Sequence, residues 1–332
     1  MTDRPWPPGA ATGIGSMPGT DIAEALRIVL GELPDLPHLP ELPARGPGAD
    51  LVGRTAGLLV DLPVELYAHR WHVTARPGRD ARVTADLWER DLDTLADLAG
   101  EYAGAVKVQA AGPWTLAAAL QLPVGGALLH DAGAVRDLTE SLAEGLRAHV
   151  AEVGRRLPAA RPLLQLDEPS LPAVLGGRIP TESGLGTLPV VEAGTAVGAL
   201  SAVVAAAGVP VVVHCCAPDV PLREIRDSGA AAVALDLALL DDLDPLGEVL
   251  DAGLGLVAGA VDTRPPALRS PVAAVSPDAV AGRVREAWRR LGFPPEALPV
   301  QVVVAPACGL AGATVAHARQ VLGACREAAR QL

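Results

Sequence analysis

Short, continuously apolar segments alternate with amphipathic segments along this chain, most regularly in its second half. Each apolar segment is rich in Val, Leu and Ala and is followed by a polar or glycine-containing turn. These segments predict strands at Thr12–Gly15, Val106–Ala110, Leu163–Leu166, Val211–His214, Ala231–Asp236, Gly255–Val261 and Val300–Ala305. Strands that are apolar on both faces are typical of a parallel sheet covered by helices on both sides.

The amphipathic segments between these strands predict helices. They fall at about 20–33, 86–102, 133–157, 189–207, 219–228, 245–252, 277–291 and 314–330. Alternating strands and helices favour an α/β protein with a (β/α)8, TIM-type barrel, because seven strand segments fit a barrel better than an open sheet. We expect the eighth strand between residues 50 and 75.

One stretch near the N-terminus departs from this alternation. Leu33–Gly48 carries prolines at positions 34, 37, 40, 43 and 47. Proline lacks the backbone N–H that helices and central strands need, so this Pro-rich stretch predicts an extended loop over one face of the barrel. A PxxP-type ligand segment is the alternative interpretation. Since no segment has the composition of an interdomain linker, residues 1–332 are expected to form a single domain.

Composition and charge narrow the class of protein. Half of the residues are hydrophobic but only 2% are aromatic, so the core is expected to consist of Ala, Val and Leu. The formal net charge is −12 and Lys and Arg form no run, which argues against nucleic acid as a partner. No apolar stretch is long enough to span a membrane, and the N-terminus lacks the apolar core of a signal peptide. We therefore expect a cytoplasmic protein without a membrane partner.

Polar side chains gather where the apolar strand segments end. They are Ser16, Gln109, Asp167, Glu168, His214, Cys216, Asp236, Asp262 and Cys308. In a parallel barrel the carboxyl ends of all strands meet at one mouth, where active sites are built. The sequence therefore predicts that these side chains contribute to one site.

The most specific chemistry is carried by His214, Cys216 and Cys308. Residues two apart on a strand point the same way, so His214 and Cys216 can bind one ion while Cys215 faces elsewhere. One imidazole and two thiolates select zinc, and three protein ligands leave a position open for a substrate. On spacing alone, ordinary buried side chains at these positions are the alternative.

Four motifs, taken in their order along the chain, resemble the C-terminal catalytic barrel of cobalamin-independent methionine synthase. They are Ile14-Gly15-Ser16-Met17-Pro18, Gln165-Leu166-Asp167-Glu168-Pro169, His214-Cys215-Cys216 and Pro306-Ala307-Cys308-Gly309-Leu310. The set covers nearly the whole chain, whereas the long N-terminal barrel of that family has no counterpart in it. The chain is thus similar to the shorter, single-barrel members.

This resemblance implies a zinc-dependent methyltransferase that moves a methyl group to the thiol of homocysteine and forms methionine. It implies that His214, Cys216 and Cys308 bind the zinc ion (Zn2+). The fourth ligand of the family is a Glu near the end of the next strand. The corresponding residue here is Asp236, one methylene shorter, and its alternative role is to cap the following helix.

The resemblance also assigns the amino-acid part of homocysteine. Asp167 is implied to hold its amino group and Ser16 its carboxylate. The chemistry agrees, because an Asp forms charge-assisted bonds with an ammonium and a Gly-Ser turn offers N–H groups to a carboxylate. Gln109 is a further candidate for substrate binding. Asp167, Glu168 and Asp262 are the catalytic candidates, although Glu168 has a helix-capping or surface role as its alternative.

The methyl donor is open between methyltetrahydrofolate and a methylated corrinoid. The family has a His after the strand end that here reads Val261-Asp262-Thr263-Arg264, and it is a proposed proton relay. Arginine cannot accept a proton near neutral pH. A folate methyl group leaves from an amine that needs a proton, whereas a corrinoid cobalt does not. The missing His therefore favours the corrinoid.

Three other functions compete with this interpretation. One is a different zinc thiol methyltransferase, of the coenzyme M type. Another is a metal-free enzyme similar to uroporphyrinogen decarboxylase, which would have no use for the His and Cys set. The third is a non-catalytic zinc- or thiol-binding protein.

Overall fold

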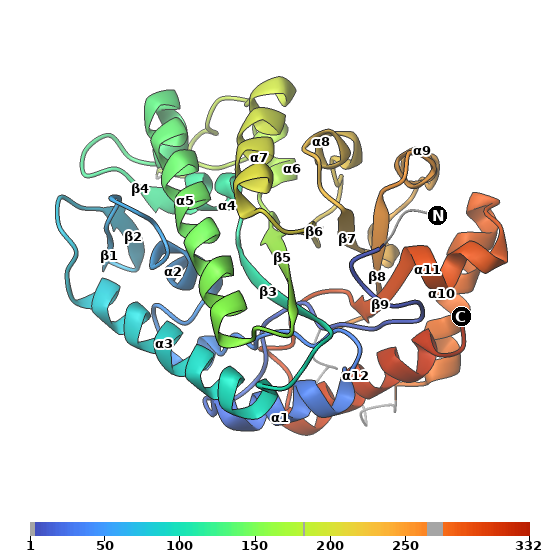
Figure 1. Ribbon diagram of the computed structural model, residues 1–332. Coiled ribbons are helices and arrows are strands. Elements are labelled where there is room, and N and C mark those ends of the chain that lie inside the picture. Colours follow the sequence, from blue (N-terminus) through green and yellow to red (C-terminus); the bar gives the residue numbers. More distant parts are fainter. Residues whose placement is uncertain (1–3, 182, 264–274) are drawn as a thin grey trace, which may run out of the picture.

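Six parallel strands curl into the main sheet of the structure, in the order β3-β5-β6-β7-β8-β9 (Figure 1). This computed structural model describes residues 4–181, 183–263 and 275–332. The strands are β3 (Ala105–Ala111), β5 (Arg161–Asp167), β6 (Val211–Cys215), β7 (Ala232–Asp236), β8 (Gly255–Val261) and β9 (Val302–Pro306). Each coincides with a strand predicted from the apolar pattern, with differences of one or two residues at most ends.

Two extended segments near the N-terminus lie between β9 and β3 and complete the barrel wall. Ala11 pairs in parallel with Val304 of β9, and His38 pairs in parallel with Lys107 of β3. The two segments also pair with each other, at Ser16 and Glu41. They are joined to their neighbours by isolated bridges rather than by full ladders, which is why their apolar patterns are short.

The predicted position of the eighth strand was wrong. Leu33–Gly48 is the extended stretch that was predicted, but part of it lies in the barrel wall rather than over one face. The remaining wall segment lies inside Leu33–Gly48, around His38, and it is buried rather than lying over a face. The residues flanking Pro40 make the necessary bonds, because Leu39 donates its N–H to Lys107 O (2.9 Å) and Glu41 donates to Gly15 O (3.1 Å). A proline is tolerated where the neighbouring N–H groups suffice.

Residues 50–75 instead form helix α2 (Leu51–Ala56) and an antiparallel hairpin of β1 (Val64–Tyr67) and β2 (Arg70–Val73). The hairpin belongs to a separate three-stranded sheet, in which β2 pairs with β4 (Leu120–Gln121). In Figure 1 this small sheet lies beside α2, at the side of the barrel. Residues 50–75 thus contain strands, but these strands join the small sheet and not the barrel.

Helices surround the curled sheet (Figure 1). They are α1 (Ile22–Glu32), α3 (Arg79–Ala99), α4 (Pro113–Ala119), α5 (Ala132–Arg156), α6 (Leu171–Leu175), α7 (Ala193–Ala207), α8 (Leu222–Asp227), α9 (Asp244–Asp251), α10 (Pro277–Leu291), α11 (Leu298–Gln301) and α12 (Val315–Ala329), with 3-10 turns η1 (Pro43–Arg45), η2 (Leu128–His130), η3 (Leu237–Leu239) and η4 (Pro295–Ala297). Several begin at the expected caps, as Asp21 does for α1 and Asp131 for α5. Within the described ranges, no helix is both long enough and apolar enough to cross a membrane.

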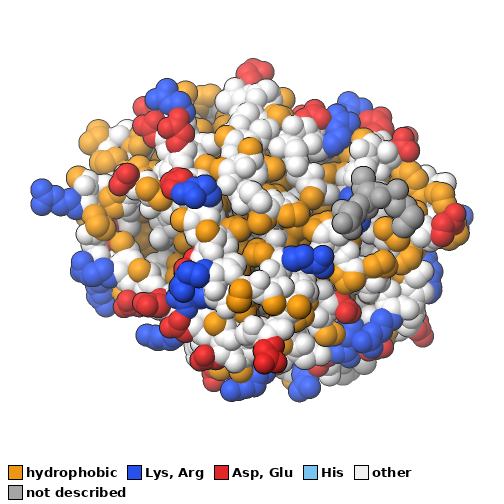
Figure 2. Space-filling model, viewed as in Figure 1, with side chains coloured by type: hydrophobic (Ala, Val, Ile, Leu, Met, Phe, Trp, Pro, Cys, Tyr) orange, Lys and Arg blue, Asp and Glu red, His pale blue; other side chains and the backbone are white. Residues whose placement is uncertain are grey.

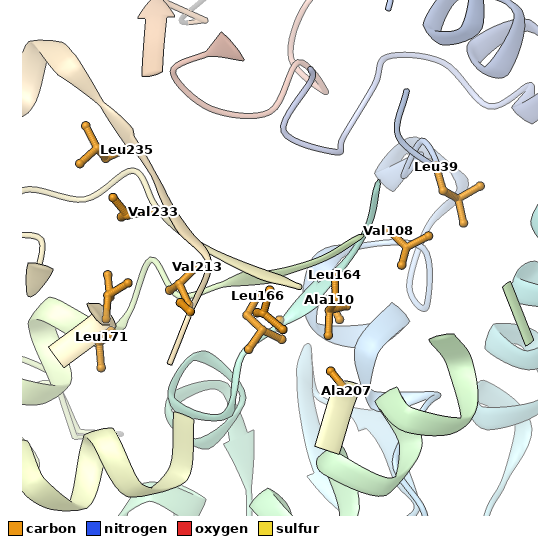
Figure 3. Packing of buried hydrophobic residues seen from close by; sticks show 14 of the residues in the cluster. Leu39, Val108, Ala110, Leu164, Leu166, Leu171, Ala207, Val213, Val233 and Leu235 are labelled. Atoms are coloured by element: carbon orange, nitrogen blue, oxygen red, sulfur yellow. The ribbon is translucent and has the colours of Figure 1, made fainter. Parts of the chain in front are cut away.

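The core has two layers that alternate along each strand. Small side chains such as Val212 and Ala234 belong to the cluster inside the barrel. Their neighbours Val213 and Val233 belong to the larger cluster between the sheet and the helices (Figure 3). Because successive residues of a strand point to opposite faces, this alternation shows which strand-end residues point into the barrel mouth.

A buried ion cluster outside the barrel wall joins η1 and α2 to α3. Asp91 of α3 is fully buried, and its carboxylate accepts bonds from both terminal nitrogens of Arg45 (2.6 and 2.7 Å) and from Nη1 of Arg54 (2.6 Å). The guanidinium of Arg54 also stacks on Trp88, 3.5 Å from the ring centroid. One carboxylate therefore bonds to two guanidinium groups that are shielded from water, and removing it would leave both without this partner.

Charged side chains of both signs are interspersed on the face shown in Figure 2. This face carries no large area of positive charge, in keeping with the net charge of −12. A polyanion would find no extended electrostatic footprint on it.

Candidate functional site

The three predicted metal ligands meet at the barrel mouth. His214 lies in β6, Cys216 follows the end of β6, and Cys308 follows β9. Their ligand atoms all lie within 4.8 Å of one another, and in the described part of the chain this is the one His, Cys, Asp or Glu group that could hold a metal ion. The sulfur atoms of Cys216 and Cys308 are 3.0 Å apart. Cys215 is buried in the barrel wall between the first two ligands.

The imidazole of His214 is held from one side and free on the other. Its Nδ1 lies 2.6 Å from Oδ1 of Asp167, and because a carboxylate can only accept, Nδ1 carries the proton. Its Nε2 is buried and has no hydrogen-bond partner among the described residues. A carboxylate on one ring nitrogen and a free lone pair on the other is the usual arrangement of a metal-binding histidine. The residues present therefore fit a metal ion with nitrogen and sulfur ligands.

The two thiols of the group differ in acidity. The hydrogen bond from Cys216 lowers the pKa of the Cys308 thiol to about 6, although burial opposes this shift. The same bond, together with burial, raises the pKa of Cys216 above its usual range. One thiolate is therefore already favoured at neutral pH, and a divalent cation would draw the proton from the second thiol as well.

Asp236, the predicted fourth ligand, lies beside this group and outside it. Its Oδ1 accepts the N–H of Ala238 (2.9 Å) and so caps η3, which is the alternative role that the sequence left open. The strand register pairs His214 with Ala234, so Asp236, two residues further on, lies on the same face of the wall as His214. Its role as a ligand stays a prediction.

Glu168 is fully buried behind the mouth. Its carboxylate accepts three bonds from the first turn of α4, from the N–H of Trp114 (2.9 Å) and from the N–H and hydroxyl of Thr115 (both 2.8 Å). Burial raises the pKa of Glu168 to about 7, while these bonds oppose the shift. Glu168 therefore caps the start of α4, which is the alternative role that the sequence suggested for it.

Asp262 follows β8 and is exposed. Together with Asp236 it lines a largely apolar cavity of about 420 Å³ at the carboxyl ends of β7 and β8. Arg264, which occupies the region of the missing relay His, lies outside the described residues. The structure therefore places Asp262 at the mouth, but its proton-transfer role stays a prediction.

Besides Asp167, the predicted substrate-binding residues are Ser16 and Gln109. The O atom of Ser16 accepts the N–H of Leu310 (2.8 Å), and a Cβ on Gly309 would come within 2.0 Å of the Ser16 hydroxyl. Ser16 is thus packed against the loop that carries Cys308. Gln109 donates to Leu39 O (2.6 Å), and its side-chain oxygen is buried with no partner in the described residues.

Two charged residues of the site were missed in the sequence. Glu41 is buried on the second wall segment, where burial and the nearby charge of Asp167 raise its pKa to about 7. Lys107 of β3 is buried too, donates to Ile14 O (2.8 Å), and has its pKa lowered to about 7 by burial. A signal for Glu41 was present, since it is a lone charge in an apolar run, but that run was interpreted as a loop.

Comparisons with known proteins agree with this architecture. The solved structure of a B12-independent methionine synthase from Shewanella sp. W3-18-1, in complex with selenomethionine, superposes with a TM-score of 0.63 and 14% sequence identity, over 98% of this chain and 97% of that chain. At this identity the likeness shows the fold, which confirms the predicted barrel class. No curated protein matches the chain.

Two further solved structures are much less similar. They are an enolase from Pseudomonas fluorescens Pf0-1 (TM-score 0.25, 12% identity, 65% of this chain and 42% of that chain) and a mandelate oxidase variant with benzaldehyde (TM-score 0.28, 17% identity, 86% and 85%). Neither superposes closely enough to bear on the function.

The family described as the catalytic domain of cobalamin-independent synthase matches residues 9–331. This match covers nearly the whole chain and includes the metal-binding group and every other candidate site residue. The protein therefore belongs to the cobalamin-independent synthase catalytic-domain family and is a methyltransferase.

Proposed function

We propose that this methyltransferase acts on the thiol of homocysteine, giving methionine, with zinc bound by His214, Cys216 and Cys308. The observation that carries the proposal is the convergence of one ligand atom from each of these residues, while the buried Nε2 of His214 has no hydrogen-bond partner among the described residues. One imidazole and two thiolates suit zinc and leave a position for a substrate. When bound, zinc lowers the pKa of a coordinated thiol, so that a thiol substrate loses its proton near neutral pH.

Asp167 serves two groups in this proposal. Its Oδ1 accepts bonds from His214 and from Gln165 Nε2 (2.7 Å), which orients the imidazole. Its second oxygen is assigned to the ammonium of the substrate. Glu41 supplies a second buried carboxyl group. It lies close enough to Asp167 for the charge of Asp167 to raise the pKa of Glu41. Two carboxylates near each other favour a cation between them and repel an anion, so an amino-acid thiol fits this site better than the sulfonate of coenzyme M.

The carboxylate of the substrate is assigned to Ser16. Its hydroxyl lies against Gly309, directly after Cys308, so a molecule whose sulfur is at the metal can place its other end there. Gln109 offers its unpartnered amide oxygen to a substrate N–H. We assign Asp236, which lies on the same face as His214, to the fourth metal position in the absence of substrate, from which the substrate thiol would displace it. A metal-free decarboxylase would leave the His and Cys group without a purpose.

Homocysteine binding to the zinc-loaded protein is expected to release about one proton per site near pH 7, because the thiol binds as thiolate. Calorimetry in buffers of different ionisation enthalpy counts that proton. Asp167→Asn should weaken homocysteine binding by roughly 2 kcal/mol, the scale of a lost charge-assisted bond. The matched control is propanethiol, which has no ammonium and should bind both proteins alike. Homocysteine binding without proton release would contradict the proposed role of the thiol.

For the donor we propose a methylated corrinoid rather than methyltetrahydrofolate. The sequence has no His between Asp262 and Ser276, and acid assistance to a folate leaving group is worth on the order of 100-fold. Methylcobalamin should therefore support faster methionine formation from homocysteine than methyltetrahydrofolate at equal concentration. Product formation is measured with both donors and with the Cys308→Ser variant as the blank. An equal or faster folate rate would contradict this choice and would make Asp262 the candidate acid.

A further inference from the structure

Glu168 follows Asp167 directly, yet its side chain points the other way. Asp167 reaches His214 at the mouth, whereas Glu168 is turned outward onto the first turn of α4 and is fully buried there. A Cβ on Gly112, the residue before α4, would lie 2.3 Å from Oε1 of Glu168. The helix start and the carboxylate therefore fit together only because residue 112 has no side chain.

The backbone around Glu168 is tied to both neighbouring strands. The N–H of Glu168 donates to His214 O (2.7 Å), and the N–H of Gly112 donates to Asp167 O (2.9 Å). Glu168 thus connects the exits of β3, β5 and β6 at the level where Asp167 bonds to the imidazole of His214. The register of β5 with β6 ends at Asp167 and His214, so the bond from the Glu168 N–H is the last backbone bond between these two exits.

The bonds of Glu168 leave it poorly suited to donate a proton. Oε1 accepts one hydrogen bond and Oε2 accepts two, and all three come from groups that are donors in this arrangement. Two of these donors are backbone N–H groups at the start of a helix, which favour a negative charge. A proton on either oxygen would have to compete with a donor already in place.

From these contacts we infer that Glu168 is a positioning residue for the metal site: its carboxylate locks the exit of β5, so that Asp167 holds the imidazole of His214 with its free nitrogen toward Cys216 and Cys308. This inference rests on the proposed metal site and goes beyond the assignment of its ligands. Groups that orient a metal-binding histidine typically change metal affinity by about 10–100-fold. Glu168 acts one residue further out, through Asp167.

The test compares zinc affinity in Glu168→Gln with the unchanged protein, by competition with a chromophoric chelator. Gln keeps one acceptor oxygen but places an NH2 group against N–H donors, so the zinc dissociation constant is expected to rise about tenfold or more. The Co2+-loaded variant should also show an altered thiolate-to-cobalt absorption band. A zinc affinity within twofold of the unchanged protein, with an unaltered cobalt band, would overturn the inference.

Asp131→Ala is the matched control, because Asp131 caps α5 by accepting the N–H groups of Gly133 and Ala134, as Glu168 does for α4. The Asp131→Ala variant loses a helix cap away from the mouth. Its free energy of unfolding should fall, but its zinc affinity should not change. If Glu168→Gln does not fold, Thr115→Val removes the hydroxyl bond to Glu168, together with the long bond that the hydroxyl accepts from the Ser170 N–H (3.5 Å), and Thr115→Ser should restore the affinity. Zinc affinity and the cobalt absorption band are both measured without methyl transfer. A protein that binds zinc but does not transfer a methyl group would therefore count against the proposed function, while the comparison of zinc affinities would still test the role of Glu168.

Discussion

Replacing Cys308 with serine is expected to remove most of the bound zinc and to abolish methyl transfer. The unchanged protein, purified without chelators, should hold about one zinc per chain, because three ligand atoms converge on one position. Serine is a much weaker zinc ligand than a thiolate, and the Cys216 thiol would lose its partner 3.0 Å away. The loss of affinity should exceed the roughly 10–100-fold that changes around a ligand produce. Elemental analysis measures the zinc content.

Two serine substitutions serve as controls for this result. Cys215 is buried in the wall between two ligands, and Cys325 is buried in α12, far from the mouth. Cys215→Ser and Cys325→Ser make the same chemical change without removing a ligand, so both should keep their zinc. An unchanged zinc content in Cys308→Ser would refute the ligand assignment.

Replacing Asp91 with alanine is expected to give the largest loss of stability, about 3–5 kcal/mol, because it leaves buried charges without a counterion. Arg45 and Arg54 both depend on this carboxylate, and the Arg54 side chain is only 1% exposed. Urea unfolding followed by circular dichroism measures the change, and zinc content checks that the mouth is intact in the folded variant.

Asp93→Ala is the matched control for this prediction. Asp93 lies on the same helix and pairs with Arg156, but its side chain is 63% exposed. Arg156 keeps its ion pair with Glu152 (2.5 Å) after the substitution, so the loss should be much smaller than for Asp91→Ala. Equal losses in the two variants would show that the buried cluster does not carry the stability assigned to it.

The ion cluster also shows where sequence patterns stop being informative. Asp91 lies three residues after Trp88 and four before Leu95, on the buried face of α3, so helical periodicity could indicate its burial. The same periodicity could not indicate that two arginines from other elements meet it there. Helix α3 itself begins at Arg79 rather than at the predicted 86. Its first turn is capped from another element, because the Glu65 carboxylate accepts the N–H groups of Gly78 and Asp80. A cap from a distant residue leaves no local signature.

The sequence by itself determined the six strands of the main sheet and the position of the chemistry. A run such as Val211–Val213 is apolar on both faces, so it had to be a buried parallel strand, and a helix had to follow it. Strand alternation then put His214 and Cys216 on one side, and parallel strands put their polar ends at one mouth. These are local rules of period and direction, and a single sequence is enough to apply them.

Only the tertiary structure decided which segments close the barrel and how the site residues are held. The pairing of His38 with Lys107, the burial of Glu41, and the contacts of Glu168 with α4 all join residues far apart in the chain. Each depends on which backbone donors or charges another segment presents at that place. A hydrogen bond or ion pair of this kind is fixed by three-dimensional proximity, which the pattern along the chain does not encode.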